Sequence, residues 1–153
     1  MIPKDKRREK LLGEMLVEYD VIDYQKLEKA LGIQRKEGGR IGDILVKLGY
    51  ATEEEIVECV SLQRGFPYLP LENCEIVREV LNMISKDIAE KYCCLPIDRI
   101  GNVLTVAMAN PLDTELLEYL KKNIPFEIQC FISIPSDIRN AIGRSYKQKE
   151  QTE

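Results

Sequence analysis

Arg40 is the residue of this sequence whose type and setting suit the binding of an anion. It follows Gly38 and Gly39 and opens the segment RIGDILVKLG, in which apolar residues recur at helical spacing. A glycine-rich approach to a helix leaves backbone N–H groups free, and a guanidinium adds a fork of donors suited to phosphate or a guanine edge. The sequence therefore predicts an anion site at Arg40. A solvated surface charge is the alternative interpretation.

Several other kinds of chemistry need residues or patterns that the sequence lacks. The 153 residues include no histidine, so Ser-His-Asp and Cys-His catalytic groups cannot form. There is no GxxxxGK[ST] phosphate loop, and no pair of carboxylates stands out for acid/base catalysis. The five cysteines form no CxxC pattern, which argues against a zinc site and favours reduced core thiols. We expect a protein that is not an enzyme and needs no metal or cofactor.

The net charge and the lengths of the apolar runs limit which partners and which cellular location can be expected. The net charge is −4, so there is no general attraction to phosphate backbones and no polymeric nucleic acid is expected as a partner. The apolar runs are strand-sized, and residues 1–10 form a basic arm without the apolar core of a signal peptide. We expect a cytoplasmic protein with no membrane span, which could reach the inner face of the membrane through partners.

The stretch that begins at Arg40 is the second copy of a 24-residue unit. Residues 11–34 and 40–63 align without gaps on either side of the five-residue spacer RKEGG. Four positions are identical, and several others are similar in the same order and with the same apolar periodicity. The identical pairs are Gly13/Gly42, Leu16/Leu45, Val17/Val46 and Gln34/Gln63.

Each copy is predicted to form a short helix followed by a longer one. Gly49 suits a left-handed end to the first helix of the second copy, and Thr52 with Glu55 predicts a capping box for the next helix. Asp20 and Asp23 occupy the matching places in the first copy, where aspartate accepts the left-handed turn less readily than glycine. Two helical pairs that bury their apolar stripes on one another would by themselves explain the duplication.

The rest of the chain is predicted to form a second lobe that contains both helices and strands. The expected fold class is therefore α+β, with a tandem helix-turn-helix repeat lobe followed by a small α/β sandwich-like lobe. Residues 64–73 contain two prolines and predict an extended connector, and 148–153 predict a polar, frayed tail. The strands are almost continuously apolar, which predicts burial on both faces or a docked partner. Between connector and tail, over 74–147, the expected elements are helices at 74–84 and 85–92, strands at 93–100 and 103–109, a helix at 113–123, a strand at 126–134 and a helix at 135–146.

Two segments resemble a known family. RIGDILVKLGYATEEEIVECVSLQ resembles the tandem motif RLGxxLxxxGxxxxxxLxxxLxxQ of MshEN-type amino-terminal domains, the GspE- and PilB-like domains of type II secretion and type IV pilus assembly ATPases. The five-residue spacer agrees with that family. YCCLPIDRIGNVLTVAMANPLDTELLEYL resembles the second half of the same domain, where A-[DN]-P-x-D precedes a helix. The resemblance extends over about residues 11–147.

The resemblance implies an accessory domain that joins a secretion or pilus ATPase, in cis or in trans, to the cytoplasmic part of a membrane platform protein. One branch of the family binds cyclic di-GMP through the two motifs, so that one half of a two-fold symmetric ligand would meet each copy. Asp113 either caps its helix or pairs with a guanine N–H edge. The ligand contacts implied by the resemblance are Leu12, Gly13, Leu16, Gln34, Arg40, Ile41, Gly42, Leu45, Gln63 and Asp113.

The first copy departs from the motif at two positions. Leu11 replaces the arginine and Asp20 replaces a glycine. A lost charged hydrogen bond is worth about 1.5–3 kcal/mol, so the docking function is placed first and cyclic di-GMP binding is the alternative. A third class, DNA binding by the helix-turn-helix pattern, is disfavoured by the acidic balance. The sequence leaves open whether the chain stands alone or precedes an ATPase.

Overall fold

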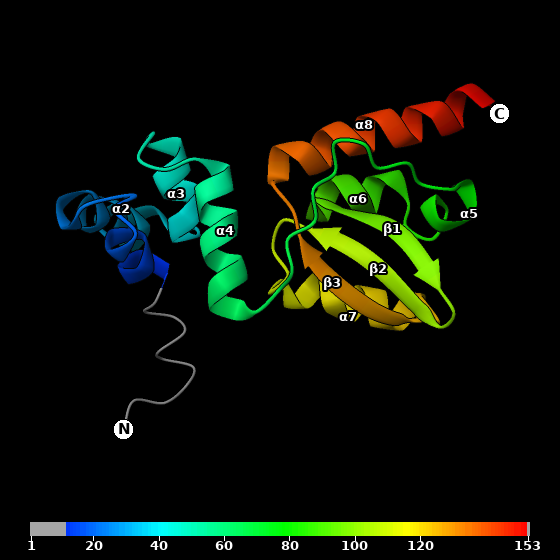
Figure 1. The fold of residues 1–153 in the computed structure, drawn as a ribbon, viewed down its shortest axis with the longest axis horizontal. Helices are drawn as coiled ribbons and strands as arrows, with labels where there is room; N and C mark the ends of the chain where they lie inside the picture. The colour runs from blue at the N-terminus through cyan, green and yellow to red at the C-terminus, as the bar shows by residue number, and fades with distance from the viewer. Residues whose placement is uncertain (1–11, 153) are drawn as a thin grey trace. The chain divides into compact units, whose positions relative to one another are not determined.

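The computed structural model of the chain describes residues 12–152, with side chains described through residue 146 (Figure 1). The chain divides into two compact units, residues 1–65 and 66–153, and each has its own buried cluster of apolar side chains. A group of helices precedes a three-stranded mixed sheet with further helices, which confirms the predicted α+β class. The basic arm at 1–10 and Leu11 lie outside the described residues.

The first unit is built of helices with strong caps. Asp23 accepts a hydrogen bond from the backbone N–H of Lys26 at 2.8 Å, and Thr52 and Glu55 form the reciprocal capping box that the sequence predicts. Each copy therefore consists of a short helix followed by a longer one. The elements are the helical residues 12–18 and the helices α2 (Tyr24–Glu37), α3 (Ile41–Lys47) and α4 (Glu53–Arg64).

The turn between the two helices has the same backbone form in both copies. Gly49 has a φ of 77°, and the N–H of the residue after it donates to the carbonyl of Leu45 at 2.9 Å. Asp20 has a φ of 60°, and the N–H of the residue after it donates to the carbonyl of Leu16 at 2.9 Å. The first copy thus holds an aspartate in the left-handed region that favours glycine. The predicted left-handed turn is confirmed.

Gly13 and Gly42 lie at matching close contacts between the helices of each copy. A Cβ atom on Gly42 would lie 2.8 Å from Cγ2 of Ile56, and one on Gly13 would lie 2.8 Å from Cδ1 of Leu27. Real Cβ atoms do not approach other carbons this closely, so only glycine fits without a shift of the neighbour. The repeated glycine is therefore explained by helix packing.

Both copies contribute to one core. Its buried members come from the two helical pairs, so each pair covers the apolar stripe of the other, as expected for stacked repeats. The side chains of Leu16 and Leu45 are completely buried. The buried members are Leu16, Ile22, Leu27, Ala30, Leu45, Ala51 and Cys59.

The second unit contains the sheet, in the order β1-β2-β3 (Figure 1). β1 and β2 are antiparallel across a turn at Gly101, and β2 and β3 are parallel with α7 between them in the chain. The central strand is buried on both faces, since Val106 and Ala107 are neighbours in β2 and both have no exposed surface. The elements are α5 (Arg78–Leu81), α6 (Lys86–Tyr92), β1 (Cys94–Ile100), β2 (Val103–Met108), α7 (Thr114–Asn123), β3 (Glu127–Ile132) and α8 (Pro135–Thr152).

Three sequence expectations need correction. The helix expected over 74–84 is reduced to α5, because Cys74 and Ile76 are half-buried while Glu75 and Val77 are exposed, the alternation of an extended chain. Within 64–73, Tyr68 forms a bridge with Ile132, and this stretch is paired to β3 rather than being only a connector. The helix α8 continues to residue 152, past the predicted frayed tail, where lysine, glutamine and glutamate favour helix.

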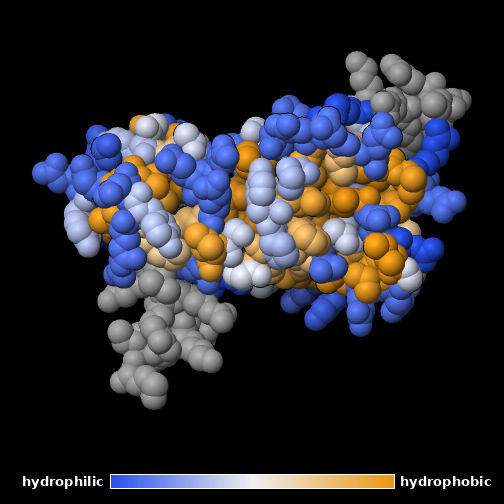
Figure 2. Space-filling view, viewed as in Figure 1, coloured by the Kyte–Doolittle hydropathy of each residue, from blue (hydrophilic) through white to orange (hydrophobic). Residues whose placement is uncertain are grey.

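None of the helices over residues 12–152 combines the length and the apolar character that a membrane crossing requires. On the face in view, Figure 2 shows apolar side chains gathered over the sheet of the second unit, with strongly hydrophilic ones mainly above and below them.

The glycine contact makes a prediction with its own control. Gly42→Ala should lower the free energy of unfolding by about 1–3 kcal/mol, because the β-branched Ile56 cannot move its Cγ2 without leaving its favoured χ1 rotamer or shifting its backbone. Gly13→Ala should cost less, since Cδ1 of Leu27 is at the end of a flexible side chain. Gly143→Ala in α8, with nothing within 4 Å, should raise stability by about 0.5–1 kcal/mol. Urea unfolding measures all three; a stabilising Gly42→Ala would contradict this packing.

Tyr146 makes a prediction about the second unit. Its hydroxyl donates to the carbonyl of Ile84 at 2.6 Å in a buried position, so Tyr146→Phe should lower the free energy of unfolding by about 1–3 kcal/mol. Burial raises the pKa of Tyr146, so its contribution is complete below the unfolded tyrosine pKa of about 10 and is lost as pH rises above that value. Urea unfolding at neutral and alkaline pH should show a smaller alkaline loss in the variant. Tyr119→Phe, at a half-buried position on α7, is the control. If the Tyr146→Phe variant and the unsubstituted chain lose equal amounts of unfolding free energy at alkaline pH, Tyr146 is not the group responsible.

Candidate functional site

Arg40 lies at the surface, immediately before α3. Its backbone is extended, with φ −87° and ψ 140°, and its side chain makes no capping hydrogen bond. The guanidinium donates twice to one carboxylate: Nε to Oδ2 of Asp43 at 3.0 Å, and Nη2 to Oδ1 at 3.2 Å. Half of the Arg40 side chain and 65% of the Asp43 side chain are exposed. The guanidinium is therefore accessible to solutes, but one edge of it is already occupied.

Asp43 is a functional candidate that the sequence interpretation missed. A signal was present, because opposite charges three residues apart on a helix are neighbours. The glycine-rich approach to α3 indicates the donors of Arg40, whereas the acceptor beside them follows only from the spacing of Arg40 and Asp43. The interpretation of Arg40 as a solvated charge must accordingly be refined to an exposed ion pair.

The expected apolar contacts divide into two sets by burial. Leu16 and Leu45 have no exposed surface and Gly42 is buried in its helix contact, so they can only support a site. Leu12 and Ile41, at matching positions of the two copies, are half-buried and retain surface for a ligand. The structure thus provides one matching pair of accessible apolar residues next to the repeated glycines.

The two glutamines that close the copies are both half-buried, in different settings. Nε2 of Gln34 donates to the carbonyl of Gly39 at 3.0 Å, which fixes the spacer just before Arg40. Gln63 lies in the last turn of α4. Gln34 therefore acts on the backbone that leads into α3, which is a positioning role.

Asp113 belongs to the second unit, whereas the residues of the tandem motif belong to the first. Its Oδ1 accepts the backbone N–H of Leu116 at 3.1 Å, so it is the N-cap of α7. The capping interpretation is confirmed. The guanine-pairing interpretation stays a prediction.

The cysteines behave as core residues. All five, which lie within the described residues, are free thiols. Burial raises the pKa of Cys59 to about 11 and that of Cys94 to about 12, so both stay protonated and unreactive near neutral pH. Across the described part of the chain, no group of three His, Cys, Asp or Glu side chains could hold a metal ion.

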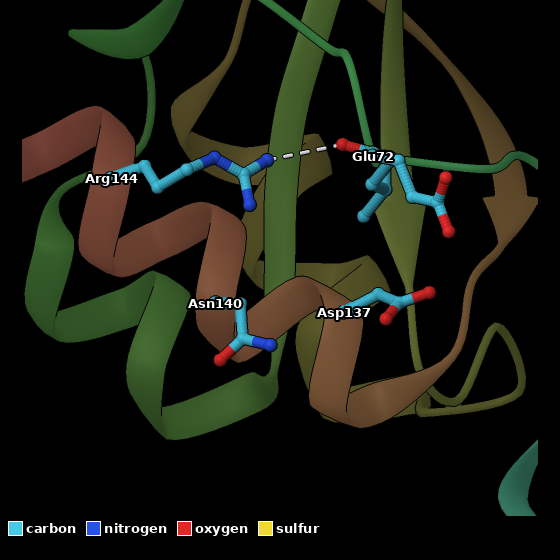
Figure 3. Close-up of a pocket in the computed structure, with 5 residues that line it drawn as sticks. Glu72, Asp137, Asn140 and Arg144 are labelled. Carbon is cyan, nitrogen blue, oxygen red and sulfur yellow. Dashed lines mark hydrogen bonds between the residues drawn. The ribbon is translucent and has the colours of Figure 1, made fainter.

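A small pocket of about 170 Å³ lies in the second unit beside α8 (Figure 3). Arg144 spans one side of it and donates to the backbone carbonyl of Leu71 at 3.1 Å. Glu72, Asp137 and Asn140 complete its lining. Ligand pockets typically hold about 300–1,000 Å³, so this pocket is too small to enclose a dinucleotide.

Comparison with known proteins identifies a family. A family model described as the MshEN domain matches residues 64–152. The type IV pilus assembly ATPase PilB of Myxococcus xanthus (strain DK1622) is 35% identical over 138 residues, which are 90% of this chain and 24% of that protein. PilB of Thermus thermophilus is 30% identical over 142 residues, 92% of this chain and 16% of that protein. The chain spans about a quarter or less of the length of these curated relatives.

Two solved structures share the fold. A structure of MshE with cyclic di-GMP is 26% identical, has a TM-score of 0.76, and is matched over 88% of this chain and 98% of that one. The N-terminal domain of XpsE is 16% identical, also with a TM-score of 0.76, over 95% of this chain and 97% of that one; this likeness concerns the fold alone. Because the family model covers more than half of the sequence, the chain belongs to the MshEN domain family, the N-terminal domains of type IV pilus and type II secretion ATPases.

Proposed function

We propose that this chain is a non-catalytic accessory domain that docks an assembly ATPase of a type IV pilus or type II secretion system to its membrane platform. The observation that carries the proposal is its match to a small part of the PilB ATPases, together with the missing phosphate loop in its own sequence. The ATPase acts in cis or in trans, and the partner is the cytoplasmic part of a membrane platform protein. The domain works in the cytoplasm.

The surface of the first unit supports a docking role. Tyr19, Tyr24 and Leu62 expose 58%, 66% and 69% of their surface. Exposed tyrosines offer apolar area with a polar tip, a combination that is enriched at protein interfaces. In this proposal the tandem helix-turn-helix lobe and the α/β sandwich-like lobe act as two modules. They are joined near residues 64–73.

Docking predicts direct binding. Isothermal titration of the purified chain with the cytoplasmic region of the platform protein from the same cell should show one-to-one binding, with a Kd on the order of micromolar. The cytoplasmic region of an unrelated membrane protein serves as the control and should give no heat of binding. Absence of binding to the platform protein, with both proteins folded, would contradict the docking function.

A second function is favoured by a specific observation: the solved MshE structure that contains cyclic di-GMP covers most of this chain. We propose that the tandem copies form a cyclic di-GMP site in which one half of the ligand meets each copy. The matching turns at Asp20 and Gly49 and the matching contacts of Gly13 and Gly42 support two equivalent half-sites. A symmetric ligand needs such equivalence.

In this proposal the site residues have distinct roles. Arg40 donates to phosphate or guanine acceptors, and Leu12 and Ile41 provide apolar contact. Gly13, Leu16, Gly42 and Leu45 hold the helices behind them, while Gln34 and Gln63 close the two copies. The first copy offers leucine where the motif has arginine, so the second copy should provide most of the polar binding energy.

The asymmetry can be tested by substitution. Arg40→Ala should weaken cyclic di-GMP binding by about 1.5–3 kcal/mol, the range for a charge-assisted hydrogen bond, and should barely change stability because the side chain is half exposed. Leu11→Arg should strengthen binding by restoring the donor fork of the motif. Lys36→Ala, a nearby exposed charge in the last turn of α2, is the control and should have little effect.

Titration calorimetry, with thermal melting of each variant, measures these effects. If Arg40→Ala and Leu11→Arg both stay folded and both bind as the unsubstituted chain does, the repeats serve packing alone and the cyclic di-GMP function is wrong. If Leu11→Arg lowers the melting temperature, residue 11 is part of the core. The effect of Arg40→Ala on affinity then decides by itself whether the cyclic di-GMP function stands.

A further inference from the structure

The ion pair between Arg40 and Asp43 has a consequence for any ligand of Arg40. The two hydrogen bonds, at 3.0 and 3.2 Å, join two guanidinium nitrogens to the two oxygens of one carboxylate. This is the two-point geometry with which arginine also binds a phosphate group or the O6 and N7 atoms of guanine. A carboxylate and a ligand cannot occupy the same pair of donors at once.

We propose that Asp43 is an internal competitor for Arg40, which lowers the affinity of the site and favours ligands that present two acceptors side by side. This inference rests on the proposed cyclic di-GMP function. A ligand with one acceptor makes one hydrogen bond in place of the two that it displaces, so the competition weakens its binding more. A phosphate or a guanine edge replaces both hydrogen bonds and displaces Asp43.

The competition is confined to the second copy. The positions that match Arg40 and Asp43 in the first copy are Leu11 and Glu14, so the first copy has an acidic residue but no guanidinium to hold. Glu14 is exposed. The chain therefore contains its own matched control, the same kind of charge at the equivalent position without a partner arginine there.

The expected effect is modest because the pair is exposed to solvent. Exposed ion pairs contribute little to stability, and release of one such pair corresponds to about a two- to fivefold change in affinity. The same modest strength lets the ligand displace Asp43 at all, since a fully buried pair would hold Arg40 permanently. Asp43 thus sets the affinity without abolishing binding.

The test is a double-mutant cycle read by calorimetric titration with cyclic di-GMP. Asp43→Asn and Asp43→Ser should each tighten binding about two- to fivefold, because they remove the carboxylate that holds the guanidinium. Glu14→Gln should leave the affinity within about twofold of the unsubstituted chain. In an Arg40→Ala background, Asp43→Asn should give no gain, since no guanidinium is left to release. Thermal melting checks that each variant is folded.

The outcomes separate this inference from the function on which it depends. The competitor role is supported if both Asp43 variants bind more tightly and this gain is lost in the Arg40→Ala background. It is also supported if binding is detected only in the Asp43 variants. If the unsubstituted chain binds and the Asp43 variants bind equally or more weakly, the competitor role is refuted while the cyclic di-GMP function stands. If Asp43→Asn still raises the affinity in the Arg40→Ala background, or if Glu14→Gln raises it equally, the competitor role is refuted and general charge repulsion explains the gain in affinity. If no variant binds, both are refuted.

Discussion

The close contact of a helical glycine with a branched side chain determines the geometry of both repeats. Gly42 meets Ile56, and Gly13 meets Leu27, at distances that leave no room for a Cβ atom. This contact brings the short helix of each copy against the long one, and the leucine three residues later is then completely buried. In the second copy, Arg40 stands at the start of the short helix and lies at the surface of the unit.

Duplication and divergence have different physical roles in the first unit. The shared core, the shared turns and the repeated glycines make the two copies structurally equivalent, which packing alone would also require. The polar residues are not equivalent, because the second copy has the Arg40–Asp43 pair and the first has leucine and glutamate at those positions. Any symmetric ligand would therefore meet similar apolar surfaces and different charges.

The sequence predicted the features that local rules determine. The capping box of Thr52 and Glu55 and the left-handed Gly49 follow from the preferences of single turns, and both are confirmed. The shortened α5 and the pairing of Tyr68 with Ile132 depend on contacts between segments far apart in the chain, which no local pattern contains. The Arg40–Asp43 pair follows from the helix spacing rule, but the motif around Arg40 indicates only its donors.

The cyclic di-GMP proposal holds that the two copies act together as half-sites for one ligand, with Arg40 as the main polar contact. The most direct measurement is a two-dimensional NMR titration of the isotope-labelled chain with cyclic di-GMP, followed through the backbone amides of Gly13 and Gly42 and the Nε–H of Arg40. The account predicts that all three signals shift together and saturate at one ligand per chain. Shifts confined to one copy, or to residues of the second unit alone, would contradict it.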